Sequence, residues 1–263
     1  MERRILLVLT SCVALISYVA LAQEKLSYPE GYKGPVANYG VEEKNIVPKG
    51  TPVAGNRPTG RRPLFFRVTW APVAGLPEEH DLDARAIADN PTLELHLWGP
   101  SGKEIQENGT PGPDEARPGN PPGSNPMHLW TGLCRQVCGM SLRDKNNYVD
   151  LSGTGKIRWL TKAGGFHQVH PIVKLADGSW FIGERGSGEV FDYTISEFTL
   201  SEMRWMMLDP VTLTPHGRLT DKVDLSKVDE IGWTDLMPGS GHGDGGYTDM
   251  GWIEVYGNKI PRK

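Results

Sequence analysis

Hydrophobic and polar residues alternate along several short stretches of this chain, which is the pattern of half-buried β-strands. In residues 93–98 (LELHLW), the three leucines fall on one side of an extended chain, and Glu94, His96 and Trp98 fall on the other. Further strands are expected over residues 63–70, 148–152, 156–162, 166–175, 179–183, 202–208, 229–235 and 251–256. Short strands at this spacing, with no long helical period between them, predict an all-β fold, an antiparallel jelly-roll β-sandwich.

The same alternation sorts the later strands into an apolar face and a polar face. Ile253 and Val255, for example, belong to the apolar set. The opposite faces carry aromatic and hydrogen-bonding side chains, namely Arg158, Gln168, His170, Trp252, Glu254 and Tyr256. A sugar ring packs its C–H face on an aromatic ring while its hydroxyls need polar partners, so we expect these six residues to form a glycan-binding face. The alternative is that the N-terminal arm or a long loop covers the two aromatic side chains.

Composition adds turns and two irregular segments to this picture. The chain has 32 glycines and 21 prolines, which indicates many turns. Residues 23–60 have no period and are expected to form an extended N-terminal arm before a β-sandwich domain at 61–263. Residues 99–128 are too rich in proline and glycine for a sheet interior, so they predict a long loop insertion.

The N-terminus resembles an export signal. A basic pair at Arg3 and Arg4 precedes an apolar run, and Ala20-Leu-Ala22 supplies small residues before a cleavage site at Gln23. Residues 1–22 are therefore expected to be a signal peptide, with the mature protein secreted or periplasmic and without a membrane span. The competing interpretation is a lipoprotein, because Leu9-Thr-Ser-Cys12 resembles a lipidation box.

The net charge limits the possible partners, and two cysteines indicate a disulfide. The formal net charge is −4 and no basic run follows the signal, which argues against a nucleic-acid partner. In an oxidising compartment, Cys134 and Cys138 favour a disulfide, although two buried thiols remain the alternative. Residues four apart on an extended strand lie about 13 Å from each other, so the bond requires a turn between them.

The glycine-rich segment 239–246 (GSGHGDGG) contains the spacing GxGxxG. A dinucleotide-binding fingerprint must open a helix, and a P-loop needs Lys-Ser/Thr after it; this segment has neither. We therefore expect a loop between two strands and no nucleotide. His242 is a candidate sugar-contacting or catalytic group. No cofactor is expected, although Asp235, Asp244 and Asp249 are weak candidates for a structural calcium site.

The segments Tyr148-Val-Asp-Leu-Ser, Asp224-Leu-Ser-Lys-Val228 and Trp252-Ile-Glu-Val-Tyr256 resemble the galactose-binding-like β-sandwich superfamily, which includes carbohydrate-binding modules. The resemblance covers about residues 145–257 and is architectural. It implies a jelly-roll sandwich and favours glycan binding. The alternatives are a glycan-active hydrolase or lyase, and an envelope structural protein without a small ligand; one fold serves unrelated functions. The sequence favours a binding protein over an enzyme.

Overall fold

The computed structural model describes residues 61–70, 90–108, 127–239 and 246–263. In these ranges the chain forms β-strands and two short 3-10 helices, η1 (Gly102–Glu104) and η2 (Leu200–Glu202). The expected signal peptide, the arm at 23–60 and residues 109–126 of the expected loop lie outside the described residues. Within the described part of the chain, no helix is long and apolar enough to cross a membrane.

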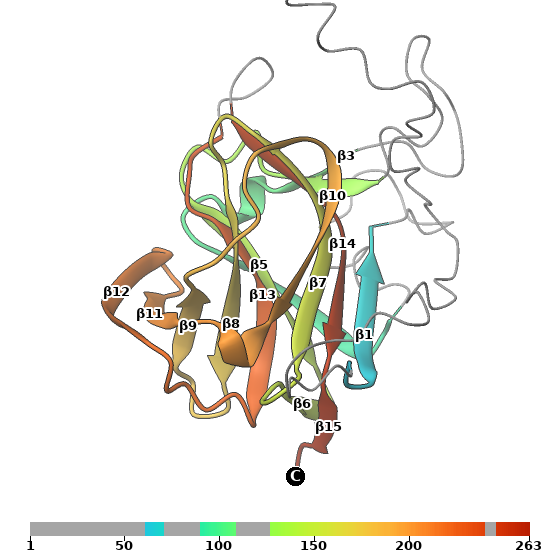
Figure 1. Ribbon diagram of the computed structural model, residues 1–263. Helices are drawn as coiled ribbons and strands as arrows, with labels where there is room; N and C mark the ends of the chain where they lie inside the picture. The colour runs from blue at the N-terminus through green and yellow to red at the C-terminus, as the bar shows by residue number, and fades with distance from the viewer. Residues whose placement is uncertain (1–60, 71–89, 109–126, 240–245) are drawn as a thin grey trace, which may run out of the picture. The chain divides into compact units, whose positions relative to one another are not determined.

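Six strands form the first sheet, sheet A (Figure 1). Its order is β10 (Val190–Thr199), β7 (Lys156–Gly164), β14 (Tyr247–Tyr256), β4 (His128–Trp130) and β3 (Gln106–Asn108). A sixth strand, β1 (Leu64–Thr69), pairs with the second half of β14. Strand β14 therefore lies at the centre of sheet A, and all pairs are antiparallel.

Nine strands form the second sheet, sheet B. Its main order is β12 (Thr214–Thr220), β11 (Trp205–Asp209), β9 (Trp180–Gly183), β8 (Val169–Leu175), β13 (Val228–Asp235), β5 (Cys138–Asp144) and β2 (Leu93–Trp98). Strand β6 (Asn147–Asp150) pairs with β13, and β15 (Asn258–Pro261) pairs with β6. The chain crosses from one sheet to the other several times, for example from β7 to β8 and from β13 to β14. The predicted antiparallel jelly-roll sandwich is confirmed.

The core lies between the two sheets. Trp159, Ile253 and Val255 of sheet A and Ile231 and Trp233 of sheet B belong to one buried cluster. Each fully buried side chain of this size contributes about 1.5–3 kcal/mol of transfer free energy. The apolar faces that alternation assigned to β7 and β14 are therefore the inner faces.

Some expectations about individual segments need correction. Residues 102–104 form η1, residues 106–108 form β3 and His128 begins β4, although the whole of 99–128 was expected to be a loop. Trp180 is buried in a second apolar cluster that also contains Ile182 of β9, whereas Trp205 and Trp233 belong to the main cluster. Trp180 lies opposite Lys174 in the β8–β9 ladder, so its side chain points to the same side of sheet B as that of Lys174. This side faces away from sheet A.

The predicted disulfide between Cys134 and Cys138 is confirmed, with Cα atoms 6.4 Å apart. A turn makes this approach possible, because the Cys134 backbone N–H donates to the carbonyl oxygen of Thr131 at 2.8 Å. The Gly239 N–H in turn donates to the Cys134 carbonyl oxygen at 2.6 Å, so the start of the glycine-rich segment is held against the disulfide turn.

Candidate functional site

Four of the six predicted outer-face residues meet on sheet A. Arg158 of β7 and Glu254 of β14 are cross-strand partners, and Trp252 and Tyr256 flank Glu254 on the same side of β14. The Glu254 carboxylate is buried and accepts from the Tyr256 hydroxyl at 2.7 Å, and Arg158 Nη1 lies 3.5 Å from its Oε2. Burial and the Glu254 hydrogen bond raise the pKa of Tyr256, so the phenol remains a hydrogen-bond donor.

Strand β1 adds a residue that the sequence did not single out. Arg67 pairs with Glu254 across the β1–β14 ladder, and its Nη1 donates to Glu254 Oε1 at 3.0 Å. The guanidinium carbons of Arg67 and Arg158 lie 5.1 Å and 5.6 Å from the centre of the Trp252 ring. Two cation–π contacts therefore fix the orientation of the partly exposed indole before any ligand arrives.

The structure does not place the other two predicted residues on this face. His170 lies in β8, which belongs to sheet B, and Gln168 lies in the segment just before that strand. His170 Nδ1 lies 2.9 Å from the carbonyl oxygen of Gly183 on β9. The expectation that all six share one face is wrong, because alternation within a strand gives its two faces but not the sheet to which it belongs. His242 lies outside the described residues.

The three aspartates proposed for calcium do not converge in the described structure. Asp235 lies inside the sandwich, bonded to Thr248, which precedes Asp249 on β14. Neighbouring residues on a strand point to opposite faces, so Asp249 points outward. Asp244 lies outside the described residues. Among the residues that the structure describes, no group of three or more His, Cys, Asp or Glu side chains is arranged to hold a metal ion.

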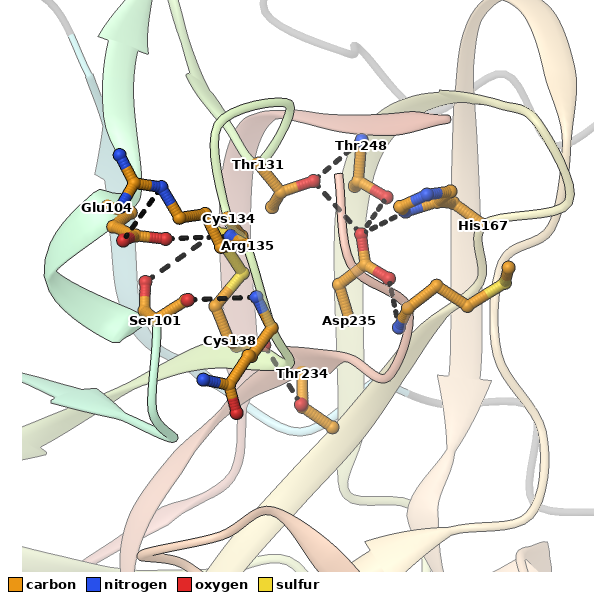
Figure 2. The surroundings of a disulfide bond; sticks show 12 residues. Ser101, Glu104, Thr131, Cys134, Arg135, Cys138, His167, Thr234, Asp235 and Thr248 are labelled. Carbon is orange, nitrogen blue, oxygen red and sulfur yellow. Dashed lines mark hydrogen bonds and ion pairs between the residues drawn. A yellow bond between two sulfur atoms is a disulfide. The ribbon is translucent and has the colours of Figure 1, made fainter. Parts of the chain in front are cut away.

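Asp235 instead links the two sheets (Figure 2). Its Oδ2 accepts from Thr131 Oγ1 at 3.0 Å, Thr248 Oγ1 at 2.9 Å and His167 Nδ1 at 2.6 Å. Its Oδ1 accepts from the Met237 N–H at 3.1 Å. Both Asp235 and His167 are fully enclosed, at 0% and 1% exposed. Complete pairing of a buried carboxylate is typical of a structural role.

A β-bulge brings more polar residues onto the outer face of sheet A. The register of β14 against β7 shifts between Met250 and Trp252, so Asp249 and Trp252 point to the same side. Gly251 occupies the bulge, where a Cβ atom would come within 2.8 Å of the Leu160 side chain. The outer face therefore continues from Trp252 past Asp249 toward Tyr247.

Asp249 belongs to a buried polar group on this extended face. His128 Nε2 lies 3.2 Å from Asp249 Oδ1, and the Tyr193 hydroxyl lies 2.9 Å from His128 Nδ1. The Tyr193 hydroxyl is also 3.4 Å from Asp249 Oδ2. His128 was not a candidate because it fell in an expected loop, and Tyr193 was not one because no strand was predicted there. The available signal for Tyr193 was the alternation of Tyr193 and Ile195 with polar residues in β10.

Sheet B also has a polar outer face. Its cross-strand row places Trp180, Lys174, Glu230, Arg143 and Glu94 side by side on five strands. Burial alone would raise the pKa of Glu230, but hydrogen bonds from His96, Lys174 and Ser141 lower it to about 2. The charges of this row are paired with one another, and Trp98 and Trp180 pack edge to face at 4.9 Å within the second apolar cluster. The charged and aromatic side chains of this surface are therefore already engaged with one another.

No family model matches the chain, and no curated protein matches it. Among solved structures, the chain is similar to the family 11 carbohydrate-binding module of a cellulosomal cellulase of Clostridium thermocellum, at 15% identity and a TM-score of 0.38, over 64% of this chain and 88% of that one. It is also similar to a family 29 carbohydrate-binding module complexed with mannohexaose, at 13% identity and a TM-score of 0.35, over 73% of this chain and 92% of that one. With TM-scores this low, no residue's role is inferred from these structures.

Proposed function

We propose that this chain is a secreted glycan-binding protein whose binding surface is the outer face of sheet A. The observation that carries the proposal is the arrangement on β14, where Trp252 and Tyr256 flank Glu254 and two arginines complete the group. Aromatic faces next to hydrogen-bonding groups complement a sugar ring, whose C–H face is apolar and whose hydroxyls are polar.

Preorganisation supports this surface. Arg67 and Arg158 hold both the Trp252 ring and the Glu254 carboxylate. A ring fixed before binding loses little rotamer entropy when a ligand packs on it. The nine steps of β14 from Tyr247 to Tyr256 span about 30 Å at roughly 3.3 Å per residue, which leaves room for several sugar units.

The test is titration of oligosaccharides and polysaccharides, first surveyed on a glycan array, into the wild type and Trp252→Ala. Loss of one aromatic platform removes roughly 1.5–3 kcal/mol, so binding in the micromolar to millimolar range should weaken about ten-fold or more. Trp98→Ala, a partly buried tryptophan on sheet B, is the matched control and should leave binding unchanged.

Two results would overturn the proposal. The first is unchanged glycan affinity in folded Trp252→Ala. The second is weakening by Trp98→Ala that equals or exceeds the weakening by Trp252→Ala, which would move the binding surface to sheet B. Circular dichroism of each variant separates loss of binding from loss of fold.

A further inference from the structure

Four neighbouring strands of sheet A each contribute one side chain to a compact group beyond the Trp252 end of the proposed binding surface. Tyr193 comes from β10, Lys162 from β7, Asp249 from β14 and His128 from β4. Tyr193, His128 and Asp249 are joined by the hydrogen bonds described above and are at most 9% exposed. We refer to these four residues as the tyrosine–histidine group.

The contacts of His128 with Asp249 and Tyr193 favour one direction of proton transfer. Asp249 is a carboxylate and can only accept from His128 Nε2, so this nitrogen carries the ring hydrogen. His128 Nδ1 is then an acceptor. The one hydrogen of the Tyr193 hydroxyl can go to His128 Nδ1 at 2.9 Å or to Asp249 Oδ2 at 3.4 Å, and we assign it to the nearer atom. Such an arrangement is that of an activated hydroxyl: the imidazole can take the phenol proton while Asp249 stabilises the imidazolium that forms.

Lys162 supplies a positive charge beside the same hydroxyl-bearing ring. Its Nζ lies 5.8 Å from the centre of the Tyr193 ring and 5.9 Å from that of Tyr247. Within the described ranges, its side chain makes no ion pair with a carboxylate. An ammonium group without such a partner next to an activated phenol is suited to a ligand that carries its own carboxylate.

We propose that the tyrosine–histidine group is a catalytic site that cleaves a uronate-containing glycan by β-elimination, an activity that rests on the proposed glycan-binding surface. Lys162 binds the uronate carboxylate. Tyr193, having passed its proton to His128 Nδ1, takes the proton from the carbon next to the carboxylate.

The electron pair of that C5–H bond forms a C4=C5 double bond, and the C4–O bond breaks. The leaving oxygen takes a proton from the Tyr193 hydroxyl, and His128 later returns its own proton to Tyr193. One product carries an unsaturated uronate at its new end and the other a free hydroxyl, so atoms and electrons balance without water or an oxidant. Tyr193 and Lys162 are catalytic residues; His128 and Asp249 are positioning residues.

Hydrolysis fits the group less well than elimination does. Glycoside hydrolysis needs a carboxylate pair that acts as acid and as base or nucleophile. Asp249 is engaged by His128, and Glu254 is held by Arg67 and Arg158. Elimination needs only a base at one carbon and a cation at the neighbouring carboxylate, and the tyrosine–histidine group contains both.

The experiment incubates the full-length exported protein with polygalacturonate, alginate, hyaluronan and glucuronan in turn. The ultraviolet absorbance of the unsaturated uronate reports cleavage, and titration calorimetry measures binding of the same polysaccharides. We expect one of them to be cleaved. Tyr193→Phe should lower kcat about 10²- to 10⁴-fold, the usual contribution of a general base, while binding is retained.

Further variants separate catalysis from a structural role. His128→Gln should lower kcat with KM unchanged, and Lys162→Gln should raise KM for the uronate. Tyr148→Phe is the matched control, because Tyr148 lies on β6 of sheet B and should leave both constants unchanged. If His128→Gln leaves kcat unchanged in a folded protein, the proton path assigned here is wrong.

The outcomes also separate this inference from the proposed function. Binding of a polyuronate without unsaturated product in any reaction overturns β-elimination and leaves glycan binding standing. Binding of neutral glycans but of no polyuronate likewise overturns β-elimination and leaves glycan binding standing. Absence of binding to every glycan overturns both. Unsaturated product that persists in Tyr193→Phe at the wild-type rate removes Tyr193 from the mechanism.

Discussion

The buried carboxylate of Asp235 allows a quantitative test of how the two sheets are held together. We consider Asp235→Asn, which keeps the shape of the side chain and removes its charge. An asparagine presents one oxygen and one NH₂ group, whereas the native site places four donors around two oxygens. If the oxygen faces Thr131, Thr248 and His167, the NH₂ group faces the Met237 N–H; the reverse orientation is worse.

The magnitude follows from this mismatch. One buried donor left without an acceptor costs about 1–3 kcal/mol, and three hydrogen bonds to a charged acceptor become weaker neutral ones. Together these terms predict a loss of about 3–5 kcal/mol in the free energy of unfolding. For a domain of this size, each kcal/mol lowers Tm by about 2–4 °C, so Tm should fall by roughly 6–20 °C.

Thermal and urea unfolding, followed by circular dichroism, would measure this loss. Asp221→Asn is the matched control, because Asp221 is an exposed aspartate after β12 and should shift Tm by no more than about 2 °C. If Asp235→Asn behaves like Asp221→Asn, the hydrogen bonds around Asp235 do not stabilise the sandwich and the reasoning fails. If Asp235→Asn does not fold at all, the loss in the free energy of unfolding is larger than predicted but has the predicted sign.

Two further predictions concern acid stability and export. Glu230 has a pKa of about 2 against 4.5 when unperturbed, so it stabilises the fold above its unfolded pKa. About 2–3 kcal/mol of this contribution should disappear as the pH falls from about 5 to 2, and urea unfolding of Glu230→Gln should show a flatter pH dependence; equal slopes would contradict this. Mass spectrometry of exported protein should find Gln23 as the first residue, and a chain beginning at lipidated Cys12 would refute cleavage there.

The candidate site was only partly predictable. Alternation placed Arg158, Trp252, Glu254 and Tyr256 on one side of their strands, and the structure brings these four into contact. It could not assign His170, because the alternation of β8 is the same whichever sheet the strand joins. Hydrogen-bond partners between strands decide that assignment, and they lie far apart in the sequence.

The sequence by itself determined the class of fold and the inner faces of its main strands, since burial of apolar side chains with a period of two depends only on local order along the chain. The glycine-rich segment likewise predicted a connection between two strands, which are β13 and β14. Only the tertiary structure decided what lies on the outer face of sheet A. The bulge at Gly251 reverses the alternation, so Asp249 lies on the same face as Trp252. Strict alternation would have placed the two side chains on opposite faces. Register and bulges are set by pairing between distant strands, and such pairing leaves no local periodic signal.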